Sequence, residues 1–268
     1  MNDELKNLIN AINSSSYDDK PYEHFYMTNV FSDAFYNKVI QSLPDDSEYT
    51  PLPHIQAMMY NPKNKDSLFS GRSRLKNKPV VSTRGDCLVD SKFVDNHKGP
   101  WKKLANILYS SQLKEVLFQK FEKTLQQRMR DVSYFIPRML EAKPTVLLTR
   151  DKKGYRIHPH PDSIKRVITF QIYLPEDNSH SHLGTVLNKP KGKLKPSIKK
   201  PDYLIEGYEH KKQFKEYKQL DYNRNSGYAF PVSSNSWHSV NEIQENYNRN
   251  SIMVMYIAPT QKISRDDQ

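Results

Sequence analysis

Hydrophobic side chains recur at helical spacing in the first half of the chain. Within residues 3–13, one helical face carries Leu5, Leu8, Ile9 and Ile12. A short strand is expected at 25–30, followed by a helix that Ser32 caps and Pro44 ends. Residues 100–130 predict further helix, in two pieces around Ser110-Ser111. The polar, proline-interrupted stretch 45–98 predicts a long ordered loop with short strands.

Near residue 132 the pattern changes to short strand-like runs separated by turn residues. These runs cover 133–141, 144–149, 155–158, 166–174, 184–188, 214–220, 227–232, 236–241 and 250–257. Many short strands with no convincing helix between them indicate a sandwich or barrel rather than a parallel βαβ sheet. We therefore expect a mainly β fold with flanking helices. It would form one domain over 1–268, with a helical support region at 1–131 and a barrel core at 132–258.

Two of these runs have faces of different character. In the first, Val167, Thr169, Gln171 and Tyr173 alternate with Ile168, Phe170, Ile172 and Leu174. In the second, Arg249, Ser251, Met253 and Met255 alternate with Asn250, Ile252, Val254 and Tyr256. The aliphatic or aromatic faces suit packing against helices. The mixed faces either meet water or line a cavity inside a barrel, where a polar ligand needs partners.

Composition narrows the class of protein. Hydrophobic residues make up 36% of the chain and charged residues 26%, which allows a core beneath a polar surface. No apolar run approaches the roughly 20 residues of a membrane helix. The acidic opening Met1-Asn2-Asp3-Glu4 is unlike a secretion leader, and the single cysteine, Cys87, fits a reducing compartment. We therefore expect a cytoplasmic protein without a membrane partner, of unassigned oligomeric state.

The formal net charge of +11 raises the possibility of a nucleic-acid partner. However, six lysines between residues 189 and 200 supply more than half of that charge, with no acid and no aromatic residue among them. This Lys/Pro-rich stretch, 189–201, favours a solvated insertion at one end of the barrel, with attraction of an anionic substrate or partner as the alternative. We expect no nucleic-acid partner, and the role of the stretch is left open.

Three residues in the second half form a candidate metal site. His160 and Asp162 lie two residues apart in Gly154-Tyr155-Arg156-Ile157-His158-Pro159-His160-Pro161-Asp162, at the end of a predicted strand. His238 follows much later, in Ser236-Trp237-His238-Ser239-Val240, again on a predicted strand. Two imidazoles and one carboxylate on one face of a metal leave three positions open, as in non-haem Fe(II) oxygenases. Those positions would serve a chelating 2-oxo acid and O₂.

A candidate carboxylate clamp follows the second histidine. Arg249 and Ser251 share one face of a predicted strand. The planar fork of a guanidinium binds a carboxylate through two parallel hydrogen bonds, and a serine hydroxyl adds a further donor. The order of histidine, aspartate, histidine and arginine along the chain therefore predicts an iron site with a clamp for a co-substrate carboxylate.

Five segments of the catalytic half carry a family resemblance. They are Gly-Tyr-x-Ile-x-Pro-His-x-Asp, Val-Ile-Thr-Phe-Gln-Ile-Tyr-Leu-Pro, Leu-Gly-Thr-Val-Leu, Trp-His-Ser-Val and Arg-Asn-Ser-Ile-Met-Val-Met-Tyr. With them, residues 154–257 resemble the 2-oxoglutarate/Fe(II)-dependent dioxygenases, on the prolyl-hydroxylase-like side of that superfamily. Residues 21–31 also resemble the start of many bacterial and viral members, whereas 32–130 match only loosely.

The resemblance implies a fold, a site and a reaction. The fold would be a double-stranded β-helix (jelly roll) with flanking helices. His160, Asp162 and His238 would hold Fe(II), and Arg249 with Ser251 would hold the distal carboxylate of 2-oxoglutarate. Tyr173 matches a tyrosine that contacts the same carboxylate in prolyl-hydroxylase-like members, and Thr169 lies on its face. The reaction would couple conversion of 2-oxoglutarate and O₂ to succinate with hydroxylation of a small-molecule or peptidyl (prolyl-type) substrate.

Other interpretations of single residues stay open. His158 could replace His160 as a ligand or line the pocket. The pair His180 and His182 lies in a turn-like polar segment, which favours a solvated loop. Arg138 and Arg150 flank the first barrel strands, where structural salt bridges are favoured over substrate or co-substrate contact. The segments expected near the substrate are 54–60, 72–86, 134–138 and 180–200.

Two alternatives concern the function itself. The same three ligands could serve a zinc enzyme or a non-catalytic cupin-like module, although Arg249 argues against both because a pure metal site has no use for a carboxylate clamp. Halogenases that resemble this family carry Gly or Ala in place of the acid, which frees a site for halide. The presence of Asp162 therefore favours hydroxylation. The substrate and its site of oxidation are not predicted.

Overall fold

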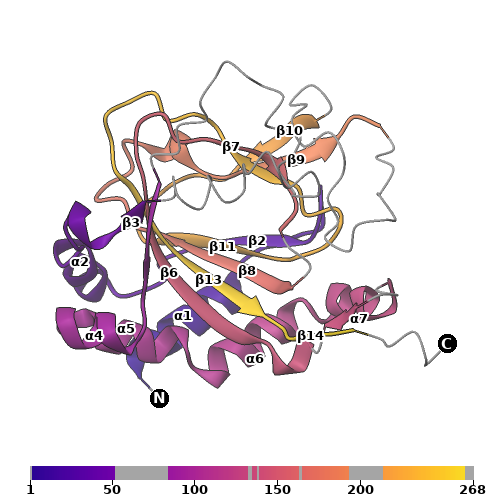
Figure 1. Cartoon of the computed structure of the whole chain (residues 1–268), viewed down its shortest axis with the longest axis horizontal. Coiled ribbons are helices and arrows are strands. Elements are labelled where there is room, and N and C mark those ends of the chain that lie inside the picture. Colours follow the sequence, from indigo (N-terminus) through magenta and orange to yellow (C-terminus); the bar gives the residue numbers. More distant parts are fainter. Residues whose placement is uncertain are drawn as a thin grey trace.

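Two antiparallel β-sheets face each other at the centre of the protein, as Figure 1 shows. The computed structural model describes residues 2–51, 84–131, 135–137, 139–162, 165–192 and 214–262. In spatial order, the large sheet contains β1 (Tyr17–Asp18), β2 (His24–Thr28), β11 (Ser226–Pro231), β8 (Arg166–Tyr173), β13 (Arg249–Ile257), β6 (Lys143–Asp151), β4 (Gly85–Leu88) and β3 (Thr50–Pro51). The small sheet contains β10 (Phe214–Gln219), β9 (Val186–Pro190), β12 (His238–Val240) and β7 (Ile157–His160).

The strand order defines a double-stranded β-helix. Of the eight strands from β6 to β13, the large sheet holds four in the order β6-β13-β8-β11 and the small sheet the other four in the order β7-β12-β9-β10. The chain therefore crosses repeatedly between the two sheets, which is the winding of a jelly roll. This topology confirms the expected mainly β fold, and each of the nine predicted strand runs overlaps a strand of the structure. The run 133–141 contains β5 (Phe135–Pro137), which pairs with β14 (Thr260–Lys262) and precedes the short helix η3 (Met139–Glu141).

Helices cover the outer face of the large sheet (Figure 1). They are α1 (Asp3–Ser14), α2 (Asp33–Gln41), α4 (Ser91–His97), α5 (Pro100–Leu108), α6 (Ser111–Lys120) and α7 (Glu122–Asp131), with short 3-10 turns η1 (Asp46–Glu48) and η4 (Ser181–Leu183) elsewhere. Ser32 and Ser110 cap α2 and α6 by accepting from backbone N–H groups at 3.3 and 3.2 Å. The sequence had placed Ser32 at this cap.

The two faces of the central strands pack as their alternation predicted. Ile168, Phe170 and Ile172 of β8 join one buried cluster with Ile252, Val254 and Tyr256 of β13 and with apolar residues of α1, α5 and α6. The opposite, mixed faces point between the sheets, where Ser251 pairs with Tyr173 and Met253 with Gln171 across the two strands. The helices thus bury the outer face of the large sheet, and its inner face carries the polar side chains.

The structure departs from the predicted helices in two places. The stretch 45–98, expected as loop and short strands, contains β3 and β4 but also α4, which the polar sequence concealed. Residues 100–130 form three helices rather than two pieces, because the chain breaks again at Phe121, a buried C-cap. Residues 52–83 and 193–213 lie outside the described part. The predictions made for 54–60, for 72–83 and for most of 189–201 therefore concern residues outside it.

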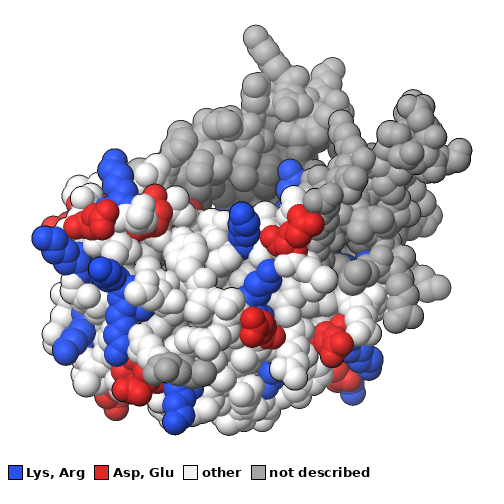
Figure 2. All heavy atoms as spheres, turned by 90° about the horizontal axis from the view of Figure 1, so that it is seen from below, with Lys and Arg blue, Asp and Glu red and all other residues white. Residues whose placement is uncertain are grey.

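Surface charge gives no single-signed patch on the face drawn in Figure 2, where lysine and arginine lie interspersed with aspartate and glutamate. Within the described residues, no helix has the length and apolarity that a membrane crossing requires.

Candidate metal centre

The three predicted metal ligands converge at one end of the small sheet. His160 ends β7, His238 begins β12, and the two are direct partners in the strand register. Their rings lie 4.3 Å apart between centroids. Asp162 follows β7 by two residues, and its carboxylate oxygens lie 3.9 Å from His160 Nε2 and 4.0 Å from His238 Nε2. Ligands about 2.1 Å from a metal at right angles lie about 3 Å apart, so shifts below about 1 Å would close this site on an ion.

Hydrogen bonding fixes which nitrogen of His238 faces the site. Its Nδ1 lies 2.9 Å from the carbonyl oxygen of Ser236, and a carbonyl can only accept. Nδ1 therefore donates to Ser236, which leaves Nε2, 4.0 Å from Asp162 Oδ2, as the nitrogen available to a metal. Metal-binding histidines are commonly oriented in this way by a partner on the second nitrogen. Within the described residues, the triad is the one group of three His, Cys, Asp or Glu side chains close enough to hold an ion.

Asp162 is held as a carboxylate by two donors. Arg166 Nη1 donates to Oδ1 and Thr169 Oγ1 to Oδ2, each at 2.5 Å. Burial by itself would raise the pKa of Asp162, but Arg166, the two histidines and the Thr169 hydroxyl outweigh it and leave the pKa below its usual value. Asp162 is thus charged at neutral pH and oriented for a cation. Neither donor was predicted as a partner of the metal site.

Thr169→Val should weaken metal binding without removing a ligand. The change keeps the branched shape of the side chain but deletes the hydroxyl that orients Asp162 Oδ2. Loss of such an outer partner typically lowers metal affinity about 10–100-fold, and we expect a decrease in this range in an anaerobic Fe(II) titration. Thr145→Val on β6 is the matched control. Equal Fe(II) affinity in the Thr169 variant and wild type would show that the bond does not support the ligand.

Arg249 lies deep between the sheets at the start of β13. Its side chain is 1% exposed, with Nε donating to Leu183 O and Nη1 to Asp151 Oδ2, both at 2.6 Å. Asp151 is its register partner on β6. Burial lowers the pKa of Arg249, but Asp151 and the surrounding tyrosines outweigh burial and raise it, so the guanidinium stays charged.

The remaining nitrogen of Arg249 has no partner. Nη2 is fully buried and makes no hydrogen bond within the described structure, and a buried donor left unpaired costs about 1–3 kcal/mol. A carboxylate entering between the sheets would satisfy it. The orphaned donor therefore fits the predicted clamp for 2-oxoglutarate, and the two imidazoles and one carboxylate fit Fe(II).

A continuous chain of hydrogen bonds connects the other predicted co-substrate residues. Ser251 Oγ contacts Thr149 Oγ1 at 2.7 Å and accepts from Gln171 Nε2 at 2.6 Å. Tyr228 links Gln171 to Thr185, and Thr185 in turn binds the Tyr173 hydroxyl at 2.9 Å. The inner wall is therefore polar and ordered. Ser251 and Tyr173 belong to this network, whereas Thr169, expected beside the same carboxylate, instead supports Asp162.

Tyr228 connects the clamp and the metal ligands electrostatically. Burial and then Tyr173 raise the pKa of its hydroxyl, while Arg249 lowers it and Asp162 raises it. Arg249 lies over the Tyr173 ring, which contacts Tyr228. Phe230 stacks on Tyr228 and contacts His238, so a row of rings leads from the arginine to the metal triad.

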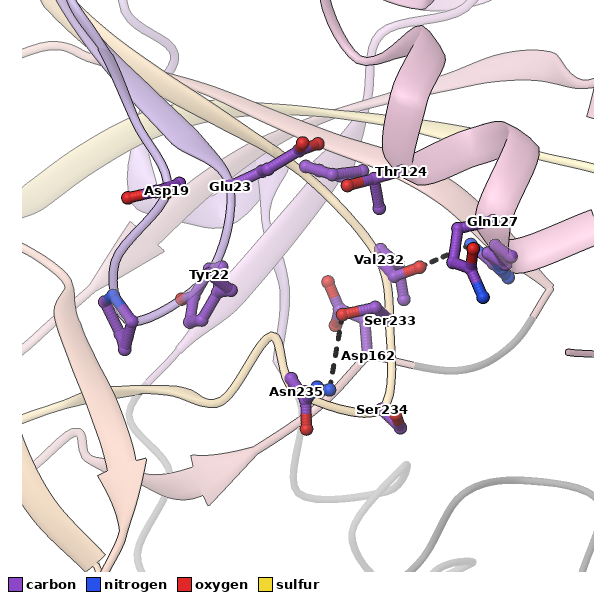
Figure 3. Close-up of a pocket in the computed structure, with 13 residues that line it drawn as sticks. Asp19, Tyr22, Glu23, Thr124, Gln127, Asp162, Val232, Ser233, Ser234 and Asn235 are labelled. Atoms are coloured by element: carbon purple, nitrogen blue, oxygen red, sulfur yellow. Dashed lines mark hydrogen bonds between the residues drawn. The ribbon is translucent and has the colours of Figure 1, made fainter.

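A cavity of about 570 Å³ opens beside Asp162 (Figure 3). Its wall comes from segment 19–23, from Thr124, Gln127 and Arg128 of α7, and from segment 231–235, which starts at the last residue of β11 and leads toward β12. The cavity meets the metal site through Asp162, which makes it the candidate substrate pocket. None of the four segments expected near the substrate contributes to this wall within the described residues.

Several single-residue predictions can be placed. Arg150 binds Asp46 at 2.8 Å and Asn250 at 2.9 Å, which matches the expected structural role. His180 and His182 lie at η4 but share the carboxylate of Glu245, at 3.0 and 2.8 Å, rather than being simply solvated. Arg138 and the side chain of His158 lie outside the described residues.

The protein is thus a double-stranded β-helix with two histidines and one carboxylate arranged as a candidate metal site. No protein-family profile and no curated protein sequence matches the chain. Among solved structures, a Pseudomonas putida prolyl-4-hydroxylase is similar, with a TM-score of 0.49, 9% identity and coverage of 95% of this chain and 99% of that one. A Trichoplax adhaerens prolyl hydroxylase, solved with a hypoxia inducible factor peptide fragment, gives 0.45, 12%, 94% and 88% for the same quantities.

A viral collagen prolyl hydroxylase from Paramecium Bursaria Chlorella virus-1, in its 2OG complex, gives a TM-score of 0.37 at 9% identity and covers 87% of this chain and 94% of that one. All three of these solved structures are prolyl hydroxylases. The reaction of this chain is inferred from the residues of its own site.

Proposed function

We propose that the protein is an iron(II)- and 2-oxoglutarate-dependent oxygenase that hydroxylates its substrate. The observation that carries the proposal is the pairing of the His160, Asp162 and His238 triad with the unpartnered buried donor of Arg249. A metal triad alone suits several chemistries. A buried guanidinium between the same two sheets, with one nitrogen left for an anion, specifically suits a metal-bound acid that carries a second carboxylate.

Each residue has a separate task in this reaction. Iron(II) at the triad would supply the oxidative chemistry, in which 2-oxoglutarate, O₂ and a substrate C–H group give succinate, CO₂ and a hydroxylated product. Arg249 would bind the distal carboxylate of 2-oxoglutarate, and Asp151 keeps the guanidinium in place. Thr169 and Arg166 hold Asp162 in its charged form. Phe230, 4.8 Å from the His238 ring, shields the site from water.

The test is co-substrate turnover. Purified protein is supplied with Fe(II), ¹⁸O₂ and 2-oxoglutarate together with a panel of small metabolites and peptides, and succinate and products are measured by mass spectrometry. Succinate and product should each gain one labelled oxygen in equal amounts. Tight metal binding without any dependence of succinate formation on 2-oxoglutarate would instead favour a non-catalytic or zinc-binding cupin-like module.

Hydroxylation should persist in chloride. Asp162 supplies the third protein ligand, so the position that a halide would need is taken. In buffer containing chloride, the product should gain oxygen and no chlorine, and Asp162→Ala should lose most activity because two ligands no longer fix the geometry. Chlorinated product from the unmodified protein, or full hydroxylation by the Asp162 variant, would contradict this assignment.

A further inference from the structure

The cavity beside Asp162 has an acidic wall. Asp19 and Glu23 line it from the segment that leads into β2, and Figure 3 shows the Glu23 side chain extending toward Thr124 of α7. Oε2 of Glu23 is buried and accepts no hydrogen bond within the described structure; Tyr17 hydrogen-bonds the same carboxylate. A buried carboxylate oxygen without a donor is costly, so this position favours a ligand that donates.

The single basic side chain in the described wall is already committed. Arg128 donates from Nη1 to the carbonyl oxygens of Arg166 and Val232, both at 2.7 Å, and to that of Val167 at 3.4 Å. It therefore fastens α7 to the barrel instead of facing a ligand. Asp162 belongs to the metal site. The charge that the described part of the wall offers to a substrate is therefore negative.

Tyr22 gives an independent indication of a ligand. The residue is 6% exposed and lines the cavity, and its hydroxyl has no hydrogen-bond partner in the described structure. Its ring packs edge-on against Phe230, which in turn contacts His238. Burial, and then Tyr228, Asp162 and Tyr173, raise the pKa of the hydroxyl. The contact with Phe230 places the Tyr22 ring on the metal side of the wall.

We infer that this cavity binds a substrate through a cationic group, an ammonium or a guanidinium, that Glu23 and Asp19 recognise. Tyr22 contributes a hydrogen bond nearer the metal. A carboxylate on the same ligand would meet no free cation among the described residues of this wall, so a basic side chain within a peptide, or a simple amine, fits better than a free basic amino acid. The inference rests on the proposed function for the reaction but not for the binding.

The experiment measures binding separately from turnover. Protein holding Fe(II) and 2-oxoglutarate is titrated anaerobically by calorimetry with N-acetyl-lysine N-methylamide, with agmatine and with free lysine. N-acetyl-norleucine N-methylamide is the neutral control of nearly the same shape. The two cationic probes without a carboxylate should bind at least about tenfold more tightly than the neutral one, as a charge-assisted hydrogen bond requires. Their relative affinities distinguish a peptide side chain from a simple amine.

Variants locate the effect. Glu23→Gln keeps the shape of the side chain and should weaken the cationic probes about tenfold without changing Fe(II) or 2-oxoglutarate binding. Glu115→Gln, on the exposed face of α6, is the matched control and should change nothing. Tyr22→Phe should weaken the probes less than Glu23→Gln does.

The same titrations in His160→Ala, which lacks a metal ligand, separate the two proposals. Suppose that His160→Ala still binds the amines and that even the unmodified protein shows no turnover. That result would refute the oxygenase function but leave the cavity assignment intact. Equal affinity for the neutral and cationic probes, or unchanged binding in Glu23→Gln, would overturn the cavity assignment whatever the metal does.

Discussion

His238→Ala should lower the affinity for Fe(II) by at least about 100-fold, because loss of an outer partner alone costs about 10–100-fold and this change removes a ligand itself. Among the described residues, the triad is the one group of side chains close enough to hold an ion, so none of its described neighbours is placed to replace the missing ligand. Formation of succinate from 2-oxoglutarate should fall to background. Fe(II) affinity and succinate are measured on the same anaerobically purified preparation.

His182→Gln is the matched control for this change. His182 is 62% exposed at η4 and pairs with Glu245, away from the triad. Its variant should bind Fe(II) as the unmodified protein does. Thermal unfolding of both variants shows whether the missing imidazole beside Phe230 has disturbed the core. A folded His238→Ala protein with unchanged Fe(II) affinity would remove His238 from the site.

Removal of Arg249 should weaken 2-oxoglutarate binding at least tenfold, since a hydrogen bond to a charged group contributes about 1.5–3 kcal/mol. The single Arg249→Ala change is ambiguous, however. It would strip Asp151, which is fully buried, of its closest partner, and breaking a buried ion pair costs about 3–5 kcal/mol of stability. The informative comparison is Arg249→Ala in an Asp151→Asn background against Asp151→Asn alone.

In that comparison the Asp151 charge is absent from both proteins, so a difference in 2-oxoglutarate affinity reports the presence of the Arg249 guanidinium. Fe(II) affinity should be equal in the two, because Arg249 is not a ligand. Arg156→Ala serves as a control, since Arg156 forms a partly exposed pair with Glu242 at 2.9 Å. Equal 2-oxoglutarate affinity in the presence and absence of Arg249 would refute the clamp.

Local patterns were sufficient for the barrel and for the ligand triad. Alternation along β8 and β13 separated the helix-facing side from the interior, and the His-x-Asp pair at a strand end anticipated a site that the register of β7 and β12 then completes. The helix α4 was missed because the sequence around Phe93 is too short and polar to show helical periodicity. A buried Phe121 likewise looks continuous with a helix although it ends one.

The partners of the site residues could not be read from the sequence. Asp151 meets Arg249 only because β6 and β13 pair in one particular register. Thr169 donates to Asp162, seven residues away, and no local pattern predicts that contact. Tyr22 and Glu23 come from a segment far from the barrel in sequence, so nothing local connects them with Asp162. Arg166 is the one partner that the sequence could have indicated, because it lies four residues after Asp162 and opposite charges at that spacing commonly pair.

The most direct test of the account is the position of bound iron and co-substrate. Crystals grown anaerobically with Fe(II) and 2-oxoglutarate are measured at the iron absorption edge, where the anomalous signal locates the metal. The account predicts one peak about 2.0–2.2 Å from His160, Asp162 and His238, with the distal carboxylate of 2-oxoglutarate on Arg249. Iron away from these three residues, or a co-substrate carboxylate away from Arg249, would contradict it.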